Sequence, residues 1–185
     1  NQDIIHELRD DIHVKFGIHP GINLIRGDAQ VPALKEVDPT IYKEVINRLK
    51  DDRSLAKYRT IYQTIVDTRE VLGQQLACET FISQSRSYAC YAGSLMGIIY
   101  ENGDVYPCEI LKGSTFGNLR ESNYDMKKIW ESATADKIRR SIKRKECFCT
   151  YECQYTCNTV YNLRFSLRFI NQILKRIIEE RFYIR

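Results

Sequence analysis

Apolar residues recur every three or four positions over much of the first seventy residues, which is the spacing of one face of an α-helix. The pattern predicts a helix over residues 3–12, a second helix that begins at Asp38-Pro39, and a third that ends at about Gly73. Asp38 suits the N-cap, and proline is common in the first helical turn. Between the first two helices, the apolar run 21–27 predicts a buried strand.

The pattern changes in the middle of the chain. Residues 94–100 and 104–107 are short extended runs on either side of Asn102-Gly103. Asn-Gly is typical of tight turns between antiparallel strands, because both residues tolerate the positive φ angles that such turns require. We therefore expect a β-hairpin here, followed by a short extended link at 116–119.

Two further stretches have helical spacing. Residues 124–143 predict a single helix whose last turns are basic, which suits the negative end of the helix dipole. Residues 160 to about 182 predict a long, strongly amphipathic helix. Helices with a few strands among them predict the α/β class.

Composition and charge exclude several kinds of protein. Of the 185 residues, 43% are hydrophobic and 28% are charged, which is typical of soluble globular chains. No apolar run reaches eighteen residues and the N-terminus is not a secretory signal, so we expect a cytoplasmic protein with no membrane partner. The chain starts with Asn1 rather than Met, and we expect further sequence upstream.

A net charge of +4 raises the question of a nucleic-acid partner. The basic residues of 137–145 and 164–185 alternate with apolar residues at helical spacing, as on the solvated side of an amphipathic helix. Nucleic-acid binding is therefore not the favoured interpretation.

The seven cysteines are the strongest chemical signal. Four of them crowd into thirteen residues, as Cys147, Cys149, Cys153 and Cys157, while Cys90 and Cys108 lie on either side of the predicted hairpin. Thiolates are the preferred ligands of zinc and iron-sulfur clusters. A disulfide framework is disfavoured, because the count is odd, no signal peptide is seen, and only one residue separates Cys147 from Cys149.

The spacing predicts one metal site assembled from two parts of the chain. A tight turn at Gly103 would bring Cys90 and Cys108 toward one point. Cys149 and Cys153 are four residues apart and would share a face of a helical turn. Six thiols are thus available for four ligand positions, and either zinc or an iron-sulfur cluster is compatible with them. Outside this group, Cys78 is expected to be an ordinary buried thiol.

Several of these motifs together resemble a known family. Cys90, the segments GDVYPC (103–108), FGNL (116–119) and IWES (129–132), and the cluster of cysteines from Cys147 to Cys157 resemble the SPASM or twitch auxiliary domain of radical S-adenosylmethionine enzymes. The resemblance implies an auxiliary 4Fe-4S cluster with Cys90, Cys108, Cys149 and Cys153 as ligands, and Cys147 as the leading substitute. Cys157 fits the family's C-x3-C step.

The chain departs from the full SPASM pattern in its second half. That pattern has a CxxC pair and one more downstream cysteine, and it holds two clusters. Here the first pair is CxC, at Cys147 and Cys149, and no cysteine follows Cys157. The shorter twitch arrangement with one cluster is therefore favoured.

The resemblance also implies a division of the chain. Residues 1–75 would be the C-terminal part of a radical SAM partial barrel with bridging helices, and the apolar run at 22–28 resembles a late strand of that barrel. Residues 76–185 would be an α+β auxiliary domain, opened by the hairpin and closed by the long helix.

The implied function is that of the C-terminal part of a radical SAM enzyme. Its auxiliary cluster would help to position the substrate or transfer electrons while a peptide or small metabolite is modified by radical chemistry, and an electron donor would be a partner. The CxxxCxxC motif of the catalytic cluster does not occur in this chain, so S-adenosylmethionine and a second 4Fe-4S cluster are expected only in a full-length protein. No catalytic residue is assigned. The alternative is a non-enzymatic binding module stapled by zinc or iron, with a basic C-terminal helix.

Overall fold

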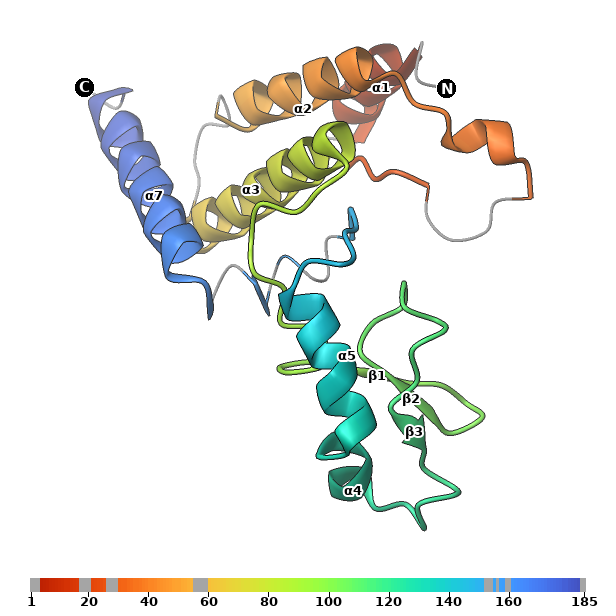
Figure 1. The fold of residues 1–185 in the computed structure, drawn as a ribbon. Coiled ribbons are helices and arrows are strands. Elements are labelled where there is room, and N and C mark those ends of the chain that lie inside the picture. Colours follow the sequence, from red (N-terminus) through yellow and green to blue (C-terminus); the bar gives the residue numbers. More distant parts are fainter. Residues whose placement is uncertain are drawn as a thin grey trace. The chain divides into compact units, whose positions relative to one another are not determined.

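A computed structural model of the chain describes residues 4–16, 21–25, 30–54, 60–151, 155, 157–158 and 161–183. The chain divides into two compact units, residues 1–82 with 168–185, and residues 83–167. The described residues combine helices with a small antiparallel sheet, which is compatible with the predicted α/β class (Figure 1). Within this described part, no helix has both the length and the apolar composition that crossing a bilayer requires.

Helices make up the first unit. They are α1 (Ile5–Phe16), the 3-10 helix η2 (Pro32–Lys35), α2 (Pro39–Ser54) and α3 (Ile61–Ser83). The predicted start of α2 is confirmed, since Asp38 Oδ1 accepts hydrogen bonds from the backbone N–H of Thr40 (2.7 Å) and Ile41 (3.4 Å). The last helix, α7 (Leu163–Tyr183), joins this unit from Arg168 onward.

The core of this unit lies where α2 packs against α3, side by side in Figure 1. The buried residues are Tyr42, Val45, Ile46 and Leu49 from α2 and Cys78 from α3. Tyr42 also meets Phe81 edge to face, with ring centroids 5.6 Å apart. Cys78 is therefore a buried core thiol, as the sequence suggested.

Two expectations for this unit are wrong. Residues 21–25 form no strand; Ile22 and Leu24 pack against the core at alternate positions, but no described strand lies beside them to complete a ladder. Residues 26–27 of the same run, and 55–59 before α3, lie outside the described residues. Helix α3 does not end at Gly73 but runs ten residues further, because Gly73 is buried inside a packed stretch of the helix.

The second unit contains the predicted hairpin. Strands β1 (Ile98–Ile99) and β2 (Asp104–Tyr106) pair antiparallel, and β3 (Gly117–Asn118) adds to the other side of β2. Val105, at the centre of β2, is fully buried. It is paired with Ile99 of β1 on one side and with Gly117 of β3 on the other. The expected extended link at 116–119 is thus the third strand of the sheet.

The hairpin turn depends on one glycine. Gly103 has φ of +92°, and its N–H donates to the carbonyl of Tyr100 at 2.8 Å. Asn102 does not adopt the positive φ that was expected; its side chain instead accepts from the backbone N–H of Asp104 (3.1 Å) and donates to the Asp104 carboxylate (2.7 Å). The positive φ that the turn requires therefore falls on Gly103, and glycine adopts such angles without a steric penalty.

The predicted single helix over 124–143 is two helices, α4 (Met126–Trp130) and α5 (Ala133–Lys143). The break lies at Ser132, whose hydroxyl accepts from the backbone N–H of Ala135 and so caps α5. Figure 1 shows α5 running beside the sheet. The core between them is formed by the buried side chains of Val105, Phe116, Ile129 and Ala135.

We predict that Gly103→Ala lowers the free energy of unfolding by about 1–2 kcal/mol, because an alanine at positive φ is strained. Its Cβ would also lie 3.0 Å from Asn118 Oδ1. The matched control is Gly113→Ala, since a Cβ at Gly113 meets nothing within 4 Å and its φ is not in the positive region. Urea denaturation of both variants checks this, and an equal effect at the two positions would contradict it.

Candidate metal centre

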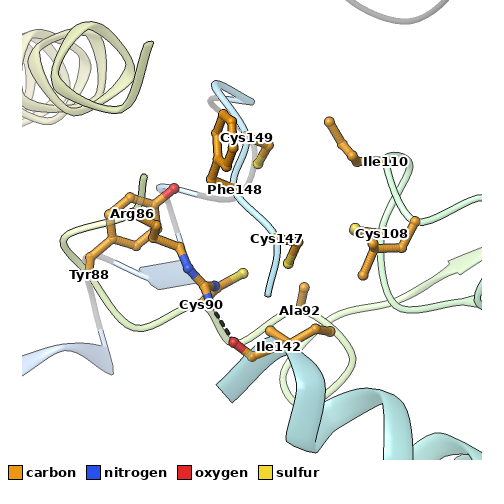
Figure 2. Close-up of a pocket in the computed structure, with 11 residues that line it drawn as sticks. Arg86, Tyr88, Cys90, Ala92, Cys108, Ile110, Ile142, Cys147, Phe148 and Cys149 are labelled. Atoms are coloured by element: carbon orange, nitrogen blue, oxygen red, sulfur yellow. Dashed lines mark hydrogen bonds between the residues drawn. The ribbon is translucent and has the colours of Figure 1, made fainter. Parts of the chain in front are cut away.

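Four cysteine side chains lie around one pocket in the second unit (Figure 2). Cys90 and Cys108 come from the segments on either side of the hairpin, as the turn predicted. Cys147 and Cys149 come from the segment that follows α5. Thiols from three parts of the chain are thus brought to one place, which is the arrangement of a metal site closed by folding.

The rest of the pocket wall is almost entirely apolar. Ile142, at the C-terminal end of α5, is 2% exposed and packs with Ala92 and Cys108 in a buried cluster. Cys90 and Cys147 pack against this cluster. The remaining lining comes from the residues Arg86, Tyr88, Ile110, Leu111 and Phe148. Such a wall lowers the polarity around the thiols, of which Cys108 is buried and Cys90, Cys147 and Cys149 are half-buried.

The turn that follows Cys90 is fastened on two sides. On one side, Arg139 of α5 donates from Nε to the carbonyl of Gly93 at 2.6 Å. On the other, the side-chain oxygen of Asn158 accepts from the backbone N–H of Tyr91 at 2.8 Å. Cys90 is therefore held by contacts from elements far along the chain rather than by the hairpin alone.

Hydrogen bonds from the backbone reach two of the sulfurs. Burial raises the pKa of the Cys108 thiol, while N–H groups of Leu111 and Ile110 that bond to its sulfur oppose this. Burial also raises the pKa of Cys149 to about 11, against the N–H of Tyr151 and in the same direction as the neighbouring thiols. These N–H groups favour the thiolate, which is the form that binds metals.

Cys147 lies between opposing influences. Burial raises the pKa of its thiol, the guanidinium of Arg86 lowers it, and Cys90 and Cys108 raise it further. With a raised pKa, the Cys147 thiol keeps its proton at neutral pH in the metal-free chain, as do those of Cys108 and Cys149. A metal that binds here must displace those protons.

The other predicted ligands are placed differently. Cys153 lies outside the described residues. Cys157 is described and half-buried, but it is not among the residues that line the pocket. Residues 146–151 have no regular secondary structure, so Cys149 does not lie on the helical turn that was expected. The assignment of four ligands stays a prediction.

The placement of the thiols bears on what could bind. Among the described residues, no group of three or more His, Cys, Asp or Glu side chains could hold a metal ion. A zinc ion with tetrahedral bonds of about 2.3 Å requires sulfurs within about 4 Å of one another. A 4Fe-4S cluster is larger and bonds each thiolate to a different iron, so its ligands surround a pocket. Four cysteines around one pocket fit that donor set.

Comparison with known families agrees with this chemistry. Residues 90–158 match the SPASM iron-sulfur cluster-binding domain. No curated protein and no solved structure gives a significant match to the chain. The resemblance inferred from the cysteine and glycine spacing is thus confirmed, and the SPASM segment (residues 90–158) contains all four pocket cysteines.

One pocket residue gave no signal in the sequence. Arg86 lies four positions before the SPASM segment, yet it is 5% exposed and lines the pocket beside Tyr88 and Cys90. Its position just before the first cysteine is the only indication that the sequence carries. Asn158, the last residue of the segment, was also missed, although it fixes the turn after Cys90.

We predict that the reduced, metal-free protein loses stability as the pH rises from about 9 to about 11. The ordinary thiol pKa is 9.0 and that of folded Cys149 is about 11, so the unfolded chain releases this proton first and deprotonation favours unfolding. The loss from this group should be roughly 1–3 kcal/mol.

Urea unfolding of the wild type and of Cys149→Ala, at about pH 8 and about pH 10.5, measures this contribution. The fall in stability between the two pH values should be smaller in the variant. The same fall in both proteins would contradict the assignment.

Proposed function

We propose that this chain is the C-terminal part of a radical S-adenosylmethionine enzyme and that it binds one auxiliary 4Fe-4S cluster. The observation that carries the proposal is the convergence of four thiols on one apolar pocket within the SPASM segment. Four thiolates are the usual ligand set of such a cluster.

In this proposal Cys90, Cys108, Cys147 and Cys149 are the four ligands. The pocket supports Cys147 in the position that the sequence-based expectation gave first to Cys153. Cys153 stays the competing fourth ligand, and Cys157 is the weaker competitor because the pocket wall does not include it.

A cluster held by these four thiolates would supply a store for one electron. The surrounding chain then tunes that store. The N–H groups of Ile110 and Leu111 at Cys108, and of Tyr151 at Cys149, withdraw charge from the sulfurs. The apolar wall formed by Ala92 and Ile142 limits access of water.

The wider activity is part of the same proposal. Residues 1–75, whose described part contains helices and no strand, would supply the bridging helices between the radical SAM barrel and the auxiliary domain. S-adenosylmethionine and a second 4Fe-4S cluster would be held by the rest of the enzyme, since this chain has no CxxxCxxC motif. A peptide or a small metabolite would be the substrate, and a separate electron donor would serve the auxiliary cluster.

The competing function is that of a binding module stapled by a single zinc ion. The cluster is favoured over this alternative by the match of residues 90–158 to an iron-sulfur cluster-binding domain, together with the four thiols around one pocket.

Metal analysis after anaerobic reconstitution with iron and sulfide separates the two functions. We predict about four irons and four sulfides per chain, with the broad visible absorbance of an iron-sulfur cluster. Stoichiometric zinc, with no sulfide bound, would establish the binding module instead.

Single cysteine substitutions then identify the ligands. We predict that Cys108→Ala and Cys149→Ala lose most of the reconstituted iron, because each removes a thiolate from a closed set of four. Cys78→Ala is the matched control, since Cys78 is a buried core thiol of the other unit and should not affect iron content. Comparison of Cys147→Ala with Cys153→Ala decides the fourth ligand. Full iron content in Cys108→Ala would refute the site.

A further inference from the structure

Arg86 is a buried cation whose hydrogen-bonding capacity is only partly used. Its side chain is 5% exposed, and one terminal nitrogen, Nη2, donates to the carbonyl of Ile142 (dashed line in Figure 2). The other two nitrogens, Nε and Nη1, are buried and have no hydrogen-bond partner among the described residues. A guanidinium is always protonated and offers five N–H donors in a fixed fork.

Burying such a charge without an anion is unfavourable, so an anion is expected beside it. Among the described residues that line the pocket, there is no aspartate or glutamate. They do include four thiols, those of Cys90, Cys108, Cys147 and Cys149. Within the described part of this pocket, the groups that can place negative charge beside Arg86 are the sulfurs.

A second arginine of the same unit shows what a purely structural role looks like. All three guanidinium nitrogens of Arg139 have protein partners: Nε bonds to the carbonyl of Gly93, Nη2 to the carbonyl of Trp130, and Nη1 to the carboxylate of Asp136. Its guanidinium also lies 5.0 Å from the centroid of the Trp130 ring. Arg86 differs because two of its nitrogens have no such partner in the part of the chain that the structure describes.

We infer that Arg86 is a positioning residue for the cluster, with Nε and Nη1 donating to sulfurs of the bound cluster or of its thiolates. The inference rests on the proposed function. Four thiolates carry more negative charge than the iron-sulfide core neutralises, and reduction adds one more electron. A fixed cation in an apolar wall therefore stabilises the reduced cluster more than the oxidised one. The hydrogen bond to Ile142 holds the fork in place for this task.

The test is a redox titration of the reconstituted 185-residue chain, followed by electron paramagnetic resonance. Arg86→Gln should lower the ratio of reduced to oxidised cluster at a fixed potential by at least tenfold, which equals a shift of 59 mV for a one-electron couple. Arg86→Lys retains the charge but loses the fork, and its shift should fall between those of the wild type and Arg86→Gln. Arg140→Gln is the control, because Arg140 is an exposed cation of α5 that does not line the thiol pocket.

Each outcome has one meaning. A wild-type potential in an Arg86→Gln protein with full iron content overturns the role of Arg86. If Arg86→Gln retains no cluster, the potential of Arg86→Lys decides, and a value equal to that of the wild type overturns the inference. A shift of equal size in Arg140→Gln also overturns it, because an exposed charge outside the thiol pocket would then suffice. Failure of the wild type itself to bind iron and sulfide refutes the proposed function rather than the part played by Arg86.

Discussion

The packing of Ile142 against Ala92 and Cys108 is the contact on which the thiol pocket depends. It joins the end of α5 to the segments that carry Cys90 and Cys108, and Cys147 follows only five residues after Ile142. The carbonyl of the same residue also accepts the hydrogen bond from Arg86. One buried isoleucine thus sets the positions of thiols and cation together, so the geometry of the pocket is a consequence of how α5 docks.

The protonation of the thiols explains how cysteines that become charged on metal binding can lie in an apolar wall. Burial raises the pKa of three of the pocket thiols, which leaves them neutral and easy to pack in the metal-free chain. The N–H groups aimed at Cys108 and Cys149 are already in place for the thiolate form. The pocket is therefore organised for both states, and metal binding couples to the release of protons.

The local features of the fold could be predicted from the sequence. The hairpin follows from Asn102-Gly103 and the start of α2 from Asp38, because a few neighbouring residues decide each. Features that depend on distant packing could not be predicted. Glycine often ends a helix, but Gly73 is buried within α3 and the helix continues past it. Ile22 and Leu24 alternate as in a strand, but they pack against the helical core and no described strand pairs with them. The break before α5 was missed because apolar spacing continues across it, although Ser132 was available as a capping signal.

The candidate site divides in the same way. The cysteines and their glycine turn indicated a shared centre, because thiol chemistry leaves few alternatives and the turn is local. The choice of the fourth ligand and the presence of Arg86 could not be deduced, since both depend on how the segment after α5 folds back on the hairpin. A buried arginine has no sequence signature of its own.

The separation in sequence between the two hairpin thiols and the two thiols after α5 also has a consequence during synthesis. The hairpin with Cys90 and Cys108 leaves the ribosome about forty residues before Cys149, an interval of a few seconds at ordinary elongation rates. During this interval Cys90 and Cys108 lack the thiols of Cys147 and Cys149, and α5 is not yet available to cover them. The nascent protein therefore passes through a stage in which Cys90 and Cys108 can meet oxidants or stray metal ions before the pocket that Ile142 and the later thiols complete has formed.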